Sequence, residues 1–168
     1  MEQELDNKIP IKETIKSFLN KNKLKIIFSI IIILITTITL IISKENKKKA
    51  NVLISEKYIK AGLLLSKNEN ENAKKYYEEI VLSRNKFYSL LALNTLIEKD
   101  LINDKEKIIN YFAKLKNSNF SKDLTDLILI KEALYLIKNE DLDFGKKILL
   151  KLIKEDSTLK TIAQQIIQ

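Results

Sequence analysis

Residues 26–43 read IIFSIIIILITTITLIIS, a run of 18 residues without a charge, a glycine or a proline. At about 1.5 Å per residue a helix of this length spans roughly 27 Å, close to the hydrocarbon thickness of a bilayer. Leu24 extends the run, and the charged ends of Lys23 and Lys25 can reach the membrane interface. A buried core helix rarely lacks a polar face over this length, so the sequence predicts a transmembrane helix over 24–43.

A cleaved signal peptide is the other class of segment that has such a run. The apolar stretch is longer than is usual in signal peptides, and Ser43, Lys44 and Glu45 after it include no Ala-x-Ala-like cleavage site. The sequence therefore predicts an uncleaved, single-pass signal anchor. Six lysines lie in residues 1–25 and six in 44–63, so the positive-inside rule gives no orientation. The run Lys47–Lys49 alone favours a cytoplasmic C-terminal side, or else a flank that contacts headgroups.

The tail before the anchor, residues 1–23, contains a short amphipathic segment. Ile11, Ile15 and Phe18 recur at helical spacing, and Pro10 stands where a helix tolerates proline in its first turn. Two interpretations stay open, a helix that lies on the inner membrane surface and a helical extension of the span.

The composition excludes several classes of function. The chain has no His and no Cys, so it lacks the commonest general base, a thiol nucleophile and Cys-ligated metal. Two glycines leave no Gly-rich phosphate loop. Serine and threonine have no histidine base, and the carboxylates Glu69, Glu71, Glu78 and Glu79 are interspersed with lysine, as on a solvated surface. We expect no catalytic residue, cofactor, metal or small-molecule substrate.

The net charge of +8 does not indicate nucleic-acid binding. Arg84 is the only arginine among 30 basic residues, and isoleucine and asparagine are abundant, which is typical of AT-rich codon usage. Nucleic-acid sites favour arginine for bidentate contacts. We expect protein and lipid partners and no nucleic acid.

Residues 44–168 form the second part of the chain, long enough for one core. Apolar residues recur with a period near 3.6, which predicts an all-α domain. In the fifth predicted helix Leu127, Ile130, Leu134 and Ile137 are expected to face inward, and in the last helix Ile162 is among those expected to pack. The expected helices cover about 49–66, 71–82, 87–98, 105–115, 121–137, 144–153 and from 157 onward.

A spacing of small residues repeats within this domain. Each copy has a small residue, a second one 12 positions later and a large residue after four more: Ala61, Ala73 and Tyr77, then Ala133, Gly145 and Leu149. The copies are 72 residues apart, so a degenerate middle copy is predicted near Leu96, Ile108 and Phe112. Small residues allow two antiparallel helices to touch, and the large residue fills the next layer. We predict repeat-packing roles for Ala61, Ala73, Tyr77, Ile108, Phe112, Ala133, Gly145 and Leu149.

This spacing resembles the tetratricopeptide repeat, although the Trp and Pro of the usual pattern are missing. The resemblance implies three helix pairs plus a final helix, stacked as a short right-handed solenoid with a concave face. One or two of Tyr76, Tyr77, Tyr88, Tyr111 and Tyr135 are candidates to line that face.

The whole arrangement also resembles a narrower family, the YfgM-like ancillary subunits of the bacterial SecYEG translocon. The residues that carry it are the tail segment IKSFLNKNK (15–23), the single anchor and the degenerate repeats. The resemblance implies a single-pass inner-membrane protein whose C-terminal domain lies in the periplasm. It implies the translocon and a periplasmic chaperone as partners in protein export.

Two functional hypotheses follow. The first is a membrane-tethered scaffold that binds protein partners through apolar side chains of the first and third repeats. The alternative is a single-pass scaffold with its helical-repeat domain in the cytoplasm, where it anchors an unrelated complex.

Overall fold

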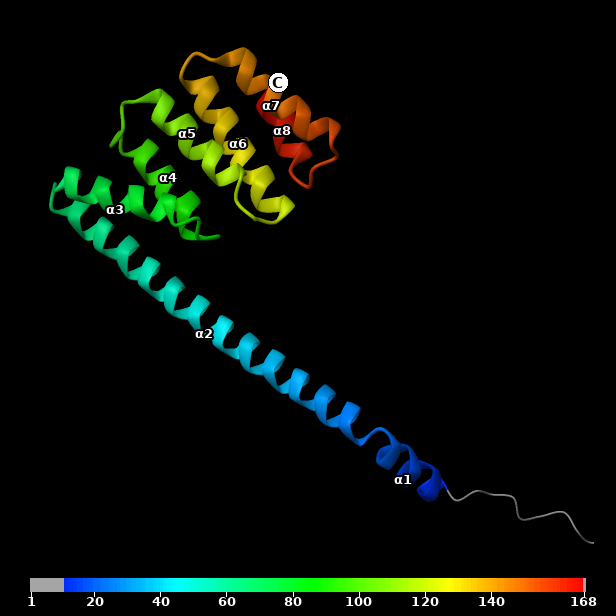
Figure 1. The fold of residues 1–168 in the computed structure, drawn as a ribbon. Helices are drawn as coiled ribbons and strands as arrows, with labels where there is room; N and C mark the ends of the chain where they lie inside the picture. The colour runs from blue at the N-terminus through cyan, green and yellow to red at the C-terminus, as the bar shows by residue number, and fades with distance from the viewer. Residues whose placement is uncertain (1–10, 168) are drawn as a thin grey trace, which may run out of the picture. The chain divides into compact units, whose positions relative to one another are not determined.

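The computed structural model describes residues 11–167, and within them every regular element is an α-helix. Pro10, expected in the first turn of the tail helix, lies outside the described residues, as does the rest of 1–10. Figure 1 shows the order of the eight helices. They are α1 (Ile11–Lys21), α2 (Lys23–Ser66), α3 (Asn70–Leu82), α4 (Tyr88–Glu98), α5 (Lys105–Lys116), α6 (Lys122–Lys138), α7 (Leu142–Lys154) and α8 (Lys160–Ile167).

The chain divides into two compact units, Met1–Lys49 and Ala50–Gln168. In the first unit the apolar run is helical and fully exposed, and α2 is the one described helix long and apolar enough to cross a membrane. The hydroxyls of Thr36, Thr37 and Thr39 each donate to a carbonyl four residues earlier, at 2.8 Å. The helix itself thus satisfies these polar groups, as a bilayer requires.

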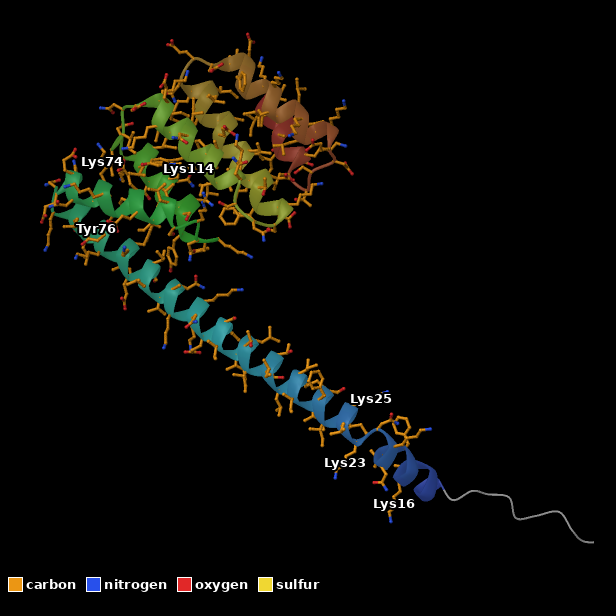
Figure 2. The ribbon with its side chains drawn as sticks, in the orientation of Figure 1. Lys16, Lys23, Lys25, Lys74, Tyr76 and Lys114 are labelled. Carbon is orange, nitrogen blue, oxygen red and sulfur yellow. The ribbon has the colours of Figure 1, made fainter. Side chains whose placement is uncertain are left out.

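The helix α2 also includes the stretch expected as a separate helix over 49–66. The connecting residues 44–48, KENKK, contain no glycine or proline and are compatible with a helix. At its other end only Asn22 separates α1 from α2, and hydrogen bonds from Asn22 N to Phe18 O and from Ile26 N to Asn22 O bridge the junction. Lys16, Lys23 and Lys25 project from these two helices (Figure 2).

The second unit is built from antiparallel neighbours. Between α2 and α3, Lys57 contacts Glu79 and Tyr58 contacts Tyr77. The residue numbers therefore run in opposite directions along the two helices, which are antiparallel. The helices α2 and α4 run in parallel, because Asn51 bonds Asn85, Ser55 bonds Tyr88 and Tyr58 bonds Thr95. A large apolar cluster lies among α2 to α5 and includes Ile128 of α6, and a smaller one lies among α6 to α8.

Five helices of this unit are followed by a residue with positive φ. These residues are Asn68, Arg84, Asp100, Glu140 and Asp156, with φ between 48° and 65°. After four of the helices the chain forms the six-to-one hydrogen bond of a Schellman motif: Glu69 N to Leu64 O, Leu101 N to Leu96 O, Asp141 N to Leu136 O and Ser157 N to Leu152 O. These turns end the helices sharply without the usual glycine.

One predicted apolar face is wrong at two of its four residues, since Ile130 is buried and Ile137 is half-buried as expected. In α6, Leu127 and Leu134 are exposed, whereas Ile128 and Ala133 are fully buried. The reason is that α6 packs on two sides, against α5 and against α7, so no single stripe describes its burial. Ile162 of α8 is also exposed rather than packed.

Candidate groove between α4 and α6

The eight residues given repeat-packing roles are all buried. Six of them, Ala61, Ala73, Ile108, Phe112, Ala133 and Leu149, have no measurable exposure. Each of α3, α5 and α7 carries one of the predicted residues as its fourth residue: Ala73, Ile108 and Gly145. Four positions later each helix places a large buried side chain: Tyr77, Phe112 or Leu149.

The pair α6 and α7 is the closest of these contacts. A Cβ atom added to Gly145 would lie 2.8 Å from the backbone oxygen of Ala133 and 2.6 Å from Cγ1 of Ile137. Real Cβ atoms do not approach other atoms so closely, so the two backbones meet where both residues are small. The other glycine, Gly62 in α2, has no such neighbour, because an added Cβ would meet only the Tyr77 hydroxyl, at 3.8 Å.

The middle pair, α4 and α5, differs in its connection. Three residues join α2 to α3 and α6 to α7, whereas six residues, 99–104, join α4 to α5. Ala61 and Ala133 lie seven residues before the positive-φ residue that follows their helix, and the equivalent position before Asp100 is Leu93. The expectation that Leu96 takes this place is therefore wrong, because the longer loop shifts the register by three residues.

The middle pair has large side chains at both positions where the other pairs have small ones, and a groove lies beside it, between α4 and α6. Leu93 and Ile108 are fully buried where the other pairs have Ala or Gly, and the backbones of α4 and α5 approach one another less extensively than those of α6 and α7. A hollow of about 180 Å³ lies between α4 and α6, and we call it the α4–α6 groove. It is lined by Asn94, Ile97 and Glu98 of α4 and by Lys131, Leu134, Tyr135 and Lys138 of α6.

The groove continues toward the long loop. A second hollow of about 210 Å³ shares Ile97, Tyr135 and Lys138 with the first and adds residues of the loop and of the turn after α6. Leu134 is 39% exposed and Ile97 is half-buried, so apolar side chains are accessible on the groove floor. Lysines and Glu98 lie around this floor, giving it a mainly basic rim.

Tyr135 is the aromatic side chain of the groove. Its ring packs on Phe112 with 6.1 Å between centroids. Burial raises the pKa of its hydroxyl, and the nearby charge of Asp104 raises it further, so the hydroxyl stays a neutral hydrogen-bonding group at physiological pH. At the end of the groove, Nζ of Lys105 donates to Asn139 O at 3.2 Å and lies 3.7 Å from Asp141.

Two ion pairs join α5 to the helices α3 and α6. Nζ of Lys116 in α5 lies 2.7 and 2.6 Å from the two carboxylate oxygens of Glu132, which is nearly buried in α6. Nζ of Lys107 in α5 lies 2.6 Å from Oε1 of Glu78 in α3. A buried charge is stable only with its partner, so these pairs restrict how α5 can sit on α3 and α6.

The remaining carboxylates of the sequence cluster have separate partners. Glu79 pairs with Lys57, Glu71 with Lys74 and Glu69 with the amide of Asn72. Over residues 11–167 no group of three or more acidic side chains is arranged to hold a metal ion. Glu69, Glu71 and Glu79 are exposed as expected, whereas Glu78 is partly buried beside Lys107.

A larger hollow of about 520 Å³ lies on the other side of the loop 99–104, against α3 and α5. Its lining is mostly polar, and oppositely charged side chains alternate along it: Glu71, Lys74, Lys99, Asp100, Asp104 and Lys107. Most of these charges are exposed and keep much of their hydration, and of the two apolar side chains in the lining, Leu101 is only partly exposed and Ile102 is buried.

Of the five tyrosines considered for a concave face, Tyr135 is the one that lines the groove. Tyr77 and Tyr111 are core residues, Tyr88 bonds Ser55, and Tyr76 packs against Lys60. Sequence reasoning missed Asn94, Lys131 and Lys138. The length of the stretch between Glu98 and the capping residue Asp104 was the available signal that this region differs from the other turns.

The fold and the groove define an all-helical protein with one candidate membrane-spanning helix near its N-terminus. No family model, no curated protein and no solved structure matches the chain.

Proposed function

We propose that this protein is a membrane-tethered helical scaffold that binds another protein through the α4–α6 groove. The observation that carries the proposal is the groove itself, an accessible apolar floor with a mainly basic rim. Small-molecule sites usually enclose about 300–1,000 Å³, and each hollow of the groove is smaller than that. Each suits one or two side chains of a docked protein segment instead.

The chemistry of the groove defines the segment that it fits. Leu134 and Ile97 favour an aliphatic or aromatic side chain, and Tyr135 can stack on it or hydrogen-bond to it. Lys131 stands one helical turn before Leu134 and Tyr135, and Lys138 stands one turn after them. Both lysines favour a neighbouring carboxylate. The expected ligand is therefore a segment with an apolar anchor next to an acidic residue.

We further propose that the second unit is a degenerate tetratricopeptide-like solenoid. Three features support this: equivalent buried positions in α3, α5 and α7, antiparallel contacts between α2 and α3, and parallel contacts between α2 and α4. Stacks of this kind present an extended binding surface. The six-residue connection after α4 is where the regular stack is interrupted.

The partner and the compartment come from the resemblance to YfgM-like subunits. We propose that the chain lies in the bacterial inner membrane with its second unit in the periplasm, close to the SecYEG translocon and a periplasmic chaperone. A tether raises the local concentration of the groove near membrane-bound partners. Even a weak groove contact would then be occupied.

In a second candidate function the chain has the opposite orientation in the membrane. Lys44 and Lys47–Lys49 follow the apolar run directly, and such a cluster ordinarily remains on the cytoplasmic side. In that arrangement the same groove would anchor a cytoplasmic complex.

Site-specific photo-cross-linking tests the proposal. A photo-reactive amino acid replaces Leu134 in the full chain, which is produced in cells together with the translocon. We expect a discrete cross-linked product that antibodies against the translocon channel subunit recognise. Lys131→Glu and Lys138→Glu together should lower its yield several-fold, because they reverse the charge of the rim.

The matched control places the same group at Leu150, an apolar residue of α7 that is 57% exposed. Equal products from positions 134 and 150 would contradict a specific role for the groove. A discrete product with a different protein at position 134 would retain groove binding and remove the translocon from the proposal.

A further inference from the structure

The connection between α3 and α4 is an exposed loop with the sequence SRNKF, residues 83–87. Phe87 is 65% exposed and Leu82, the last residue of α3, is 49% exposed. The ring of Phe87 touches only one aromatic neighbour, the edge of Tyr88 at 5.0 Å between centroids. The loop thus presents two large apolar side chains to its surroundings.

Positive charge accompanies these side chains. Arg84 and Lys86 are both exposed, and among residues 11–167 neither forms an ion pair. No aspartate or glutamate occurs from Ile80 to Ile97. The loop is therefore a locally cationic surface with an apolar tip.

The loop is fixed to the residues that follow the predicted span. Nδ2 of Asn85 donates to Oδ1 of Asn51 at 2.7 Å, and the hydroxyl of Tyr88 donates to Ser55 at 3.0 Å. Asn51 is eight positions after Ser43, so even a fully extended chain would hold Asn51 within about 29 Å of the end of the span. This limit holds for any orientation of the second unit, so the loop is within reach of the headgroups.

We propose that the loop 83–87 is a second membrane contact, in which Phe87 and Leu82 enter the interface and Arg84 and Lys86 bind anionic headgroups. Phe and Leu side chains on a basic surface insert at the boundary between headgroups and acyl chains, and nearby basic residues are attracted to anionic lipid. The contact orients the helical unit on the bilayer that anchors it. It goes beyond the proposed function, since it needs the anchor but no protein partner.

The chain contains no tryptophan, so Phe87→Trp introduces a single fluorescent probe. The full chain is reconstituted into phosphatidylcholine vesicles with or without phosphatidylglycerol, and quenching by lipids brominated along the acyl chain is measured. The matched control is Phe144→Trp, because Phe144 is 58% exposed on another helix, α7, where Asp141 and Asp143 precede it and balance the charge of Lys147 over its ring. Vesicle flotation and circular dichroism verify insertion and folding of both variants.

We expect the probe at 87 to be quenched several-fold more than the probe at 144, and more strongly when phosphatidylglycerol is present. Arg84→Gln with Lys86→Gln in the same background should reduce that quenching. Equal quenching at positions 87 and 144 would overturn the proposal. A blue-shifted but unquenched probe at 87 would also overturn it, because it would place Phe87 against protein. Either failure would leave the groove cross-linking result unaffected.

Discussion

The helix pairs α6–α7 and α4–α5 have side chains of opposite size where their two helices face each other. In α6–α7, Ala133 and Gly145 let the two backbones meet, and three residues connect the helices. In α4–α5, Leu93 and Ile108 occupy the equivalent positions, and six residues connect the helices. Small residues thus produce a closed pair, whereas bulky ones accompany the accessible α4–α6 groove beside the pair.

The largest effect is expected from Ile108→Ala in the middle pair. Ile108 is fully buried, so truncation leaves a cavity and should lower the free energy of unfolding by about 2–5 kcal/mol. Alanine is also the residue that the pair α2–α3 has at the equivalent position, Ala73. Urea unfolding measures the effect, with Ile162→Ala at an exposed site of α8 as control. A loss no larger than that of the control would show that the middle pair does not depend on bulk.

The opposite change should be harmful in the third pair. Gly145→Ala improves helix propensity, yet the added Cβ would meet the Ala133 oxygen at 2.8 Å. We expect a net loss of about 1–3 kcal/mol from overpacking. Gly62→Ala is the matched control, because its Cβ has space and should stabilise the protein by roughly 0.5–1 kcal/mol. Equal effects of the two substitutions would contradict the close approach of α6 and α7.

Alkaline pH should weaken the first and middle pairs by a smaller amount. Burial raises the pKa of Tyr77 and of Tyr111 above 10.0, and the charges of Tyr58 and Glu78 respectively raise them further. The folded state then holds these protons more tightly than the unfolded state. The stabilisation that the two protonated tyrosines contribute is fully present below about pH 10, and it is lost as the pH rises through their pKa values in the folded state.

Thermal unfolding between pH 9 and 11 measures this loss, with the melting temperature expected to fall. Tyr77→Phe and Tyr111→Phe should flatten the dependence, since neither variant has a phenol to titrate at that site. The third pair has Leu149 where the first has Tyr77, so Leu149→Met should leave the slope unchanged. An unaltered slope in the tyrosine double variant would contradict the assignment.

The smallest effect on stability is expected at the groove itself. Leu134 is 39% exposed, so Leu134→Gln should change the free energy of unfolding by less than about 0.5 kcal/mol. The same substitution should weaken capture of a partner by a cross-linker placed at Lys131. A large loss of stability would mean that Leu134 is a core residue and not part of a binding surface.

Much of the helical architecture could be predicted from the sequence. The apolar run 26–43 and the 3.6-residue periodicity gave helices whose bounds agree with the structure within about three residues, except where α2 continues through KENKK. The small residues Ala61, Ala73, Ala133 and Gly145 are buried as expected. Local signals suffice for such features because propensity and spacing act along one helix.

The groove could be predicted only in part, because it depends on contacts between helices. Leu134 belongs to the stripe predicted to face inward in α6, but it is exposed because α6 packs on two sides, against α5 and against α7. Likewise, Glu132 is buried in α6 because Lys116 of α5 lies against it. No pattern along a single helix shows either fact.

The central claim is that the chain crosses a membrane once and exposes its helical unit on the far side. The chain has no cysteine, so single substitutions give clean labelling sites. Ser157 is a poor site because it is buried and bonds Asp126, whereas Asn119 is exposed between α5 and α6. Asn119→Cys and, in the tail, Asn7→Cys are therefore tested with a membrane-impermeant maleimide in bacterial cells whose outer membrane is permeable. The account predicts labelling at 119 alone before the inner membrane is disrupted. Labelling at 7 alone would place the helical unit in the cytoplasm, and labelling at both sites would contradict a single crossing.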